Sequence, residues 1–232
     1  MDRTIVLDGR TIAYTLERKR VKNVNLRVRG GSLFVSAPRW VPLAVIEGFL
    51  RSRAEFILGA LSRTEGSTAR SAAEGDALNY LGKSLTLRLE RAGRARIRVE
   101  GEFLCAALRT PEDPESVKRA LDKWYRAESE RLCRQYFERL YPHFAALGVP
   151  RSEIRMRAMR SAWGNCRPAR RVVTFNAKLA AVPESCIEYV VAHELCHFLH
   201  ADHSAAFYAA LARVIPDWKT RRAALRRFSS LL

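Results

Sequence analysis

The sequence lacks a disulfide framework, a signal peptide and a membrane-spanning run. Its cysteines number five, and their odd count and irregular spacing do not fit the paired pattern of a disulfide-rich secreted domain. The N-terminal segment is too charged for a signal peptide, and no run approaches the ~18 apolar residues that a membrane span needs. We therefore expect reduced thiols, no membrane contact and a cytoplasmic location.

Acidic residues are scarce relative to basic ones. The chain has 24 Asp and Glu residues against 41 Lys and Arg residues, a formal net charge of +17. Such a surplus predicts attraction to polyanions such as nucleic acid, although net charge alone equally fits an arginine-rich protein surface. Apolar residues make up 48% of the 232 residues, which is enough for one large domain or two small ones.

The first 110 residues have the pattern of a β-rich region. Apolar and polar residues alternate on both sides of Gly30-Gly31, which predicts a hairpin. One helix is expected from Leu43 to Ser62, because apolar residues recur there at helical spacing. A polar loop is expected at Thr64–Asp76. Further strand pairs follow this loop, and no internal repeat is apparent.

Helices dominate the rest of the chain. A long helix is expected after Pro111 and Pro114, with its end around Leu147-Gly148. A strand hairpin around Gly164 follows, and then a helix that carries most of the histidines. Strands first and helices later indicate an α+β protein, with a β-rich N-terminal region that contains one helix at 1–110 and a second domain at 111–232.

Histidine is also scarce, yet four of the five histidines are concentrated in one short segment. His193-Glu194-Leu195-Cys196-His197 has the pattern H-E-x-x-H. Residues four apart lie on one face of a helix, so both imidazoles can bind one Zn²⁺ ion. Glu194, about 100° further round the helix, can instead take a proton from a zinc-bound water. The alternative is two ordinary histidines on an amphipathic helix, but apolar neighbours would bury these polar groups, and a metal satisfies them.

The third ligand depends on where this helix ends. On a continuous helix His203 would lie about 9 Å beyond His197 along the axis. It can bind the same ion only if the helix ends soon after His197 and the chain turns back. Asp202 tolerates turn conformations and Ser204 can cap the next helix, so such a turn is plausible. We expect His203 as the third ligand and keep His200 as the alternative.

Two cysteines are further alternatives, because thiolates bind zinc well. Cys196 lies three residues after His193 and points away from the direction that the two histidines share, which favours packing in the core. Cys166 lies on the hairpin that should approach the site, so it stays open as a neighbour of the metal.

Several of these stretches together are similar to a known family. The shared stretches are Trp163-Gly164-Asn165-Cys166, the strand at Asn176, the Y-V-V-x-H-E-L-x-H run from Tyr189 to His197, H-S-x-x-F from His203 to Phe207, and P-D-x-K from Pro216 to Lys219. With them the chain resembles the YgjP-type family of metal-dependent hydrolases, bacterial relatives of the SprT-like and WLM-domain zinc metallopeptidases. The β-rich first half is similar as well, so the resemblance covers nearly the whole chain.

The resemblance implies a zincin-like metallopeptidase domain with an active-site helix and a β-hairpin or sheet. It also implies zinc held by His193, His197 and His203, with Glu194 as general base. Two positions depart from the family pattern without touching these residues: Asn165, where many relatives carry Ser, and Phe56, where Trp is expected.

The motif predicts a zinc metallopeptidase in which Glu194 assists the attack of a zinc-bound water on a peptide bond of a polypeptide substrate. The strand Val172–Asn176 is expected to align the peptide through its edge, with Trp163 as a wall of the cleft. Three residues are candidate donors to the oxyanion: Tyr189, Tyr208 and Arg160.

Two other functions stay open. A metal-dependent hydrolase of another amide or ester would use the same water activation. A nucleic-acid-associated zinc protein acting on DNA-bound proteins is favoured by the charge of +17 and by analogy to SprT-like relatives. Its further support is a C-terminal group of basic residues: Arg213, Lys219, Arg221, Arg222, Arg226 and Arg227. A structural zinc is usually closed by four protein ligands, so an acid beside three histidines favours catalysis.

Overall fold

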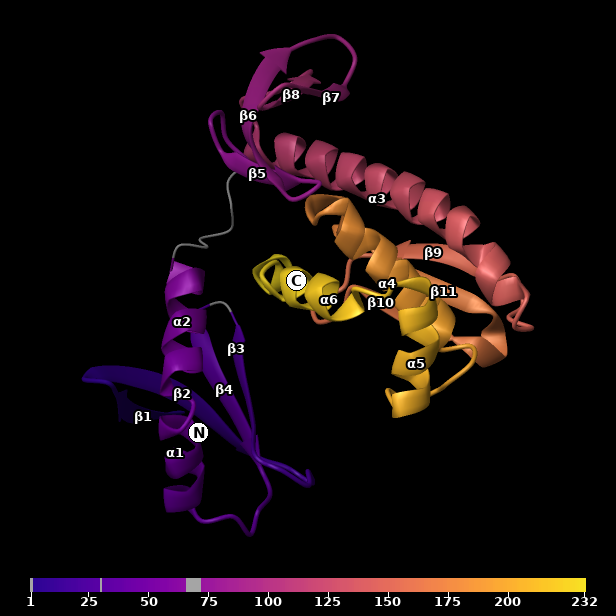
Figure 1. Ribbon diagram of the computed structural model, residues 1–232. Coiled ribbons are helices and arrows are strands. Elements are labelled where there is room, and N and C mark those ends of the chain that lie inside the picture. The colour runs from indigo at the N-terminus through magenta and orange to yellow at the C-terminus, as the bar shows by residue number, and fades with distance from the viewer. Residues whose placement is uncertain (1, 30, 66–71) are drawn as a thin grey trace. The chain divides into compact units, whose positions relative to one another are not determined.

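The computed structural model describes residues 2–29, 31–65 and 72–232 (Figure 1). The chain divides into two compact units, Met1–Arg70 and Ser71–Leu232, whereas the sequence predicts a boundary near residue 110. Both units combine helices with strands, so the protein is α+β, as expected. Gly30 of the predicted hairpin and residues 66–71 of the predicted loop lie outside the described residues.

The first unit is a four-stranded sheet covered by helices. Its strands β1 (Asp2–Leu7), β2 (Arg10–Arg18), β3 (Asn25–Arg29) and β4 (Ser32–Ala37) lie in the order β1-β2-β4-β3. The inner strands β2 and β4 are parallel, and each outer strand is antiparallel to its neighbour. The alternating pattern of β4 buries Leu33, Val35 and Ala37 in one core with residues of the helices.

The single helix predicted from Leu43 to Ser62 is wrong. The structure has two helices, α1 (Leu43–Arg51) and α2 (Ala54–Glu65). The break follows from Ser52, whose hydroxyl donates to the carbonyl of Phe49 at 2.8 Å, a bond that competes with the helix ladder and bends the chain. The buried residues keep helical spacing across the break, which is why periodicity did not reveal it: Ile46, Leu50, Ala54, Ile57 and Leu61.

The second unit begins with another four-stranded sheet. Strands β5 (Ala77–Tyr80), β6 (Lys83–Arg91), β7 (Arg96–Glu100) and β8 (Phe103–Leu108) lie in the order β5-β6-β8-β7. Leu87 and Leu104 of this sheet share a core with Val117 of the long helix α3 (Pro114–Ala145). Because this sheet packs on α3, it belongs to the same unit as the helices that follow.

The two sheets share one topology. In each, two hairpins place their inner strands side by side in parallel, and the helix that comes next packs on the sheet. Each first hairpin also turns through two residues of positive φ, Asp8-Gly9 at 46° and 79° and Leu81-Gly82 at 50° and 80°. The strand pairing therefore repeats, although the sequence shows no internal repeat.

Helix α3 packs against the β5–β8 sheet and also contributes to the core of the histidine-bearing helix, and it confirms the long helix predicted after Pro111 and Pro114. The carboxylate of Asp113 caps its first turn by accepting from the amides of Glu115 and Ser116, both at 3.1 Å. The chain leaves the helix through Gly148, whose φ of 81° suits glycine.

The remaining elements form the part of the second unit that carries the histidines. Strands β9 (Glu153–Arg157), β10 (Gly164–Arg167) and β11 (Val172–Asn176) form a sheet in the order β10-β11-β9. The helices are α4 (Glu184–Cys196), α5 (Ala205–Val214) and α6 (Trp218–Arg226). Three short 3₁₀ turns complete it: Pro168–Arg170, Leu179–Ala181 and Ser229–Leu231.

Strand β11 is the central strand of this sheet, so the expectation that it offers a free edge is wrong. It pairs antiparallel with β10 and parallel with β9, and all of its residues are buried. Strand β10 lies at an edge of the sheet instead. Within the described part of the chain, no strand pairs with its outer side.

Helix α4 is held from several sides. It packs against α3 and the sheet in one large core. The β5–β6 turn binds the segment before α4, because the amide of Leu81 donates to the carbonyl of Ala180 at 2.8 Å and the amide of Gly82 donates to the carbonyl of Ala181 at 3.2 Å.

Among the described residues, no helix has both the length and the apolar composition needed to span a membrane.

Candidate metal centre

The histidine-bearing helix ends where binding of His203 as the predicted third ligand requires it to end. Helix α4 stops at Cys196, and His197 is its C-cap residue. The chain then turns, and Ser204 caps α5 by accepting from the amide of Phe207 at 3.4 Å. His203 precedes that cap, so the turn brings it back toward the side chains of α4.

Three histidines converge as a result. One ring nitrogen each from His193, His197 and His203 lies within 4.8 Å of the others. The Nε2 atoms of His193 and His203 are 3.0 Å apart. This group does not include His200, which contributes its backbone carbonyl: Nδ1 of His197 lies 3.2 Å from that oxygen. A hydrogen on Nδ1 would leave Nε2 of His197 free to accept, the form that a metal ligand needs.

Phe207 of α5 supports all three imidazoles. Its ring centroid lies 4.9 Å from His193, 4.8 Å from His197 and 4.9 Å from His203. The phenyl ring is fully buried. Nδ1 of His193 is also buried and makes no hydrogen bond within the described part of the chain, so packing against Phe207 and Tyr189 orients this ring.

Glu194 lies against the edge strand β10. A Cβ atom added to Gly164 would lie 2.5 Å from Oε1 and 2.8 Å from Cδ of Glu194, so only glycine permits this contact. The backbone amide of Cys166, on the same strand, also donates to the Glu194 carboxylate. The contact of Gly164 with Glu194 was not predicted, because the only signal in the sequence was the place of Gly164 beside Trp163 in the family motif.

Burial sets the electrostatics of the site. It raises the pKa of the Glu194 carboxyl to about 8, against the lowering effect of the Cys166 amide. It lowers the pKa of His193 to about 3, and the neighbouring histidines and Arg222 act in the same direction. His193 is therefore neutral near pH 7 and can donate a lone pair, while Glu194 has the pKa of a group that exchanges protons near that pH.

The two cysteines considered as ligands do not join the histidine group. Cys196 is fully buried, and burial raises the pKa of its thiol to about 12. Burial, followed by the charge of Glu194, raises the pKa of the Cys166 thiol to about 12 as well. Both thiols therefore stay protonated and are poor ligands in this form.

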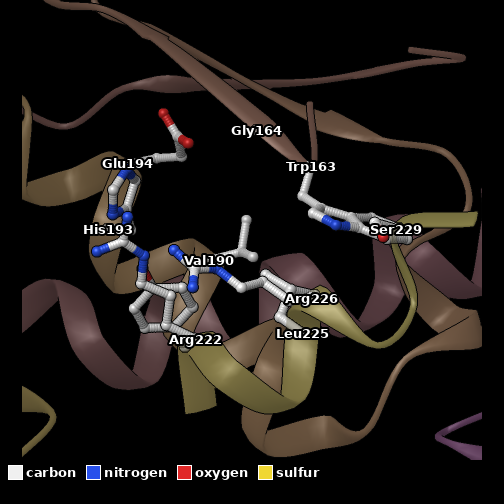
Figure 2. A pocket seen from close by; sticks show the side chains of 10 residues that line it. Trp163, Gly164, Val190, His193, Glu194, Arg222, Leu225, Arg226 and Ser229 are labelled. Carbon is white, nitrogen blue, oxygen red and sulfur yellow. The ribbon is translucent and has the colours of Figure 1, made fainter. Parts of the chain in front are cut away.

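A cavity of about 270 Å³ opens beside the histidines (Figure 2). Its lining includes His193 and Glu194 of α4, Trp163 before β10, and Arg222 and Arg226 of α6. Trp163 thus lines the cleft, as expected. Of the candidate oxyanion donors, Tyr189 also lines the cavity, whereas Tyr208 stacks beside His203 with ring centroids 6.2 Å apart. Arg160 is exposed and does not line it.

Arg222 and Arg226 were predicted to be part of a basic C-terminal surface, but both line the cavity. Their spacing of four residues places them on one face of α6, but only the packing of α6 against α4 brings that face to the histidines.

Comparison with known proteins agrees with this geometry. A family model described as YgjP-like, metallopeptidase domain, matches residues 22–228. The matched region contains the three converging histidines, Glu194, Gly164 and both arginines of the cavity. No curated protein sequence matches the chain significantly.

Proposed function

Because the chain belongs to the YgjP-like metallopeptidase family, we propose that it is a zinc peptidase with Glu194 as its general base. Family membership makes it a metal-dependent peptidase. The proposal adds that the metal is zinc, that His193, His197 and His203 are its ligands, and that Glu194 is the general base. The observation that carries it is the convergence of three imidazole nitrogens within 4.8 Å beside a buried carboxylate.

The donor set fits zinc in a catalytic site. Three neutral imidazoles are a common protein ligand set of such sites and leave a coordination position for water or substrate. When bound, zinc supplies a Lewis acid that lowers the pKa of water toward ~7 and polarises a carbonyl group. The carbonyl of His200 and the ring of Phe207 hold the imidazoles in place, which limits the reorganisation that binding requires.

Glu194 performs the proton transfers in this proposal. It accepts a proton as water attacks the carbonyl carbon of the scissile bond, and it donates that proton to the amine that leaves. Burial raises its pKa to about 8 without a metal, and a bound Zn²⁺ ion would lower this pKa, so that the carboxylate could accept a proton near neutral pH. The amide of Cys166 and the contact with Gly164 fix the direction of its carboxylate.

A polypeptide is the substrate that the surroundings favour. Strand β10 has an outer side on which an extended peptide can pair, and it lies against Glu194. The adjoining cavity offers room for a substrate side chain. All five cysteines are free thiols, which agrees with the cytoplasmic location that we propose.

The test is the variant Glu194→Gln, which keeps the size and polarity of the side chain but cannot accept the proton. We expect cleavage of unfolded casein by the zinc-loaded protein to fall by about 10²- to 10⁴-fold. The zinc content should stay the same, because Glu194 is not a ligand. Cleavage at the wild-type rate with zinc bound would contradict the assignment.

A small ester substrate separates the proposal from the second kind of hydrolase. A zinc-loaded wild-type protein that hydrolyses a p-nitrophenyl ester through Glu194, but cleaves no peptide, would be a hydrolase of another substrate class. The proposal requires peptide cleavage that a chelator abolishes and added zinc restores.

A further inference from the structure

Two arginines share the cavity with the metal centre. Arg222 and Arg226 lie four residues apart on α6, and both line the space that His193 and Glu194 border. In Figure 2 their side chains extend from α6 toward His193. A cavity at a reaction centre that presents two guanidinium groups is built to receive negative charge.

These arginines differ from their neighbour Arg221. Arg221 forms ion pairs with Glu188 at 2.5 Å and with Asp217 at 2.9 Å. Within the described part of the chain, no ion pair joins a carboxylate to Arg222 or Arg226. Among the described residues that line the cavity, only Glu194 is acidic. The cavity thus holds two cationic groups whose charge the protein does not neutralise by contact.

Arg222 is also held in position. Its Nη1 atom donates to the hydroxyl of Tyr208 at 3.1 Å. The Tyr208 ring stacks on Trp218 with centroids 4.3 Å apart and planes at 15°. A guanidinium fixed in this way loses less conformational entropy when it binds a ligand. Arg226 is exposed and can approach the same ligand from the next turn of the helix.

The other walls of the cavity are apolar. Trp163, Val190 and Leu225 line it together with the two arginines. Such a combination suits a ligand with a short carbon chain and an anionic end, because the chain packs on the apolar wall while the charge reaches the guanidinium groups. The volume of about 270 Å³ leaves room for a substrate side chain or for the end of a peptide.

We propose that Arg222 and Arg226 form a subsite that binds a carboxylate of the peptide substrate next to the scissile bond. The inference rests on the proposed peptidase function and adds its specificity. The carboxylate belongs to an Asp or Glu side chain or to the C-terminus of the peptide. The basic residues of α6 do not form one continuous surface for a nucleic acid. Arg221 is neutralised by ion pairs, and Arg222 and Arg226 face a small cavity.

The test compares fluorescent peptides that differ only in having Glu or Gln beside the cleaved bond, each with a free or an amidated C-terminus. We expect the zinc-loaded wild-type protein to cleave one of the carboxylate-bearing peptides with a kcat/KM roughly tenfold or more above that of the Gln peptide with an amidated C-terminus. Loss of the preference on changing Glu to Gln identifies a side-chain carboxylate, and loss on amidation identifies the C-terminus.

Variants assign the preference to the arginines. Arg222→Gln and Arg226→Gln should each bring the ratio toward one, and Arg226→Glu should favour a Lys-containing peptide. Arg227→Gln removes the same charge from the exposed neighbouring position, outside the cavity lining, and should keep the wild-type ratio. An unchanged ratio in both Arg222→Gln and Arg226→Gln would overturn the subsite.

Binding separates failure of the subsite from failure of the peptidase proposal. Fluorescence anisotropy of the same peptides with zinc-loaded Glu194→Gln protein does not require turnover. One outcome is that the wild type cleaves no peptide while the Glu194→Gln protein still binds the carboxylate peptide preferentially through Arg226. In that case the peptidase proposal fails and the subsite stands. If the arginine variants lose salt-sensitive binding of a double-stranded oligonucleotide and no carboxylate preference exists, the ligand is nucleic acid and the inference is wrong.

Discussion

Gly164 and Glu194 are in direct contact, because the edge strand β10 passes over the first part of the H-E-x-x-H motif. A methyl group on Gly164 would lie 2.7 Å from Cγ of Glu194, well inside the van der Waals distance. The glycine therefore determines where the carboxylate of the proposed general base lies. Two segments that are thirty residues apart in the sequence act as one unit of the site.

The variant Gly164→Ala tests this contact. We expect the added methyl group to displace the Glu194 side chain and to lower kcat by about 100-fold, since a shift of about 1 Å in a catalytic group has effects of that size. The zinc content should stay the same, because Gly164 is outside the converging histidine group and the nearest atoms to the added methyl belong to Glu194. Gly93→Ala is the matched control, as a Cβ atom there meets nothing within 4 Å. Full activity of Gly164→Ala would show that the carboxylate needs no such positioning.

Phe207→Ala tests the support under the imidazoles. Removing a fully buried phenyl ring should destabilise the protein by about 3–5 kcal/mol, and it should also weaken zinc binding because all three rings lose a packing partner. Urea denaturation and zinc titration measure the two effects. Phe56→Ala serves as the control, because the Phe56 side chain is 56% exposed. Zinc affinity equal to that of the wild type would mean that the imidazoles are oriented without Phe207.

Asn176 holds the loop that leads into β10. Its Nδ2 atom donates to the carbonyls of Met159 at 2.8 Å and Ala162 at 2.9 Å, and its Oδ1 accepts from the amide of Lys178. We expect Asn176→Ala to cost about 1–3 kcal/mol for each buried group left without a partner. Asn176→Asp should be at least as harmful, because it loses both donors and places a buried carboxylate oxygen against the carbonyl oxygens of Met159 and Ala162. Unchanged urea midpoints for both variants would refute this role.

The stability of the metal-free protein should depend on pH because of Glu194. Its folded-state pKa of about 8 lies above the value of 4.5 for an exposed carboxyl. The folded state therefore binds more protons between these values, and stability falls as pH rises from 4.5 to 8. Glu194→Gln removes this loss and should raise the melting temperature of chelator-treated protein at pH 8.5, by roughly 2–4 °C per kcal/mol gained, but not at pH 4.5. The exposed control Glu102→Gln should show no such difference between the two pH values, and an equal effect of Glu194→Gln at both would contradict the raised pKa.

The histidine geometry could be predicted because it depends on local rules. The spacing of His193 and His197 fixes their common face on a helix, and the turn residues Asp202 and Ser204 indicated where the chain reverses. The long helix after Pro111 and Pro114 followed in the same way from these prolines and from its apolar period. The structure agrees at these positions because short-range preferences and packing favour the same conformation.

The features that the sequence did not predict depend on contacts between distant segments. The central position of β11 follows from parallel pairing with β9, and such pairing leaves little trace in the order of residues. The repeated topology of the two sheets is a property of strand pairing. The arginines of α6 reach the cavity only through the packing of that helix on α4, and the amphipathic pattern of α6 is equally compatible with an exposed basic surface.

The most direct test of the metal centre is the zinc content of three proteins purified in parallel: wild type, His203→Ala and His200→Ala. We expect one zinc ion per chain in the wild type and in His200→Ala, because the His200 ring lies outside the converging group and its backbone carbonyl is retained. His203→Ala should bind zinc at least about 100-fold more weakly, as the loss of a ligand predicts. Unchanged affinity in His203→Ala, or a wild-type protein that takes up no transition metal, would contradict the account.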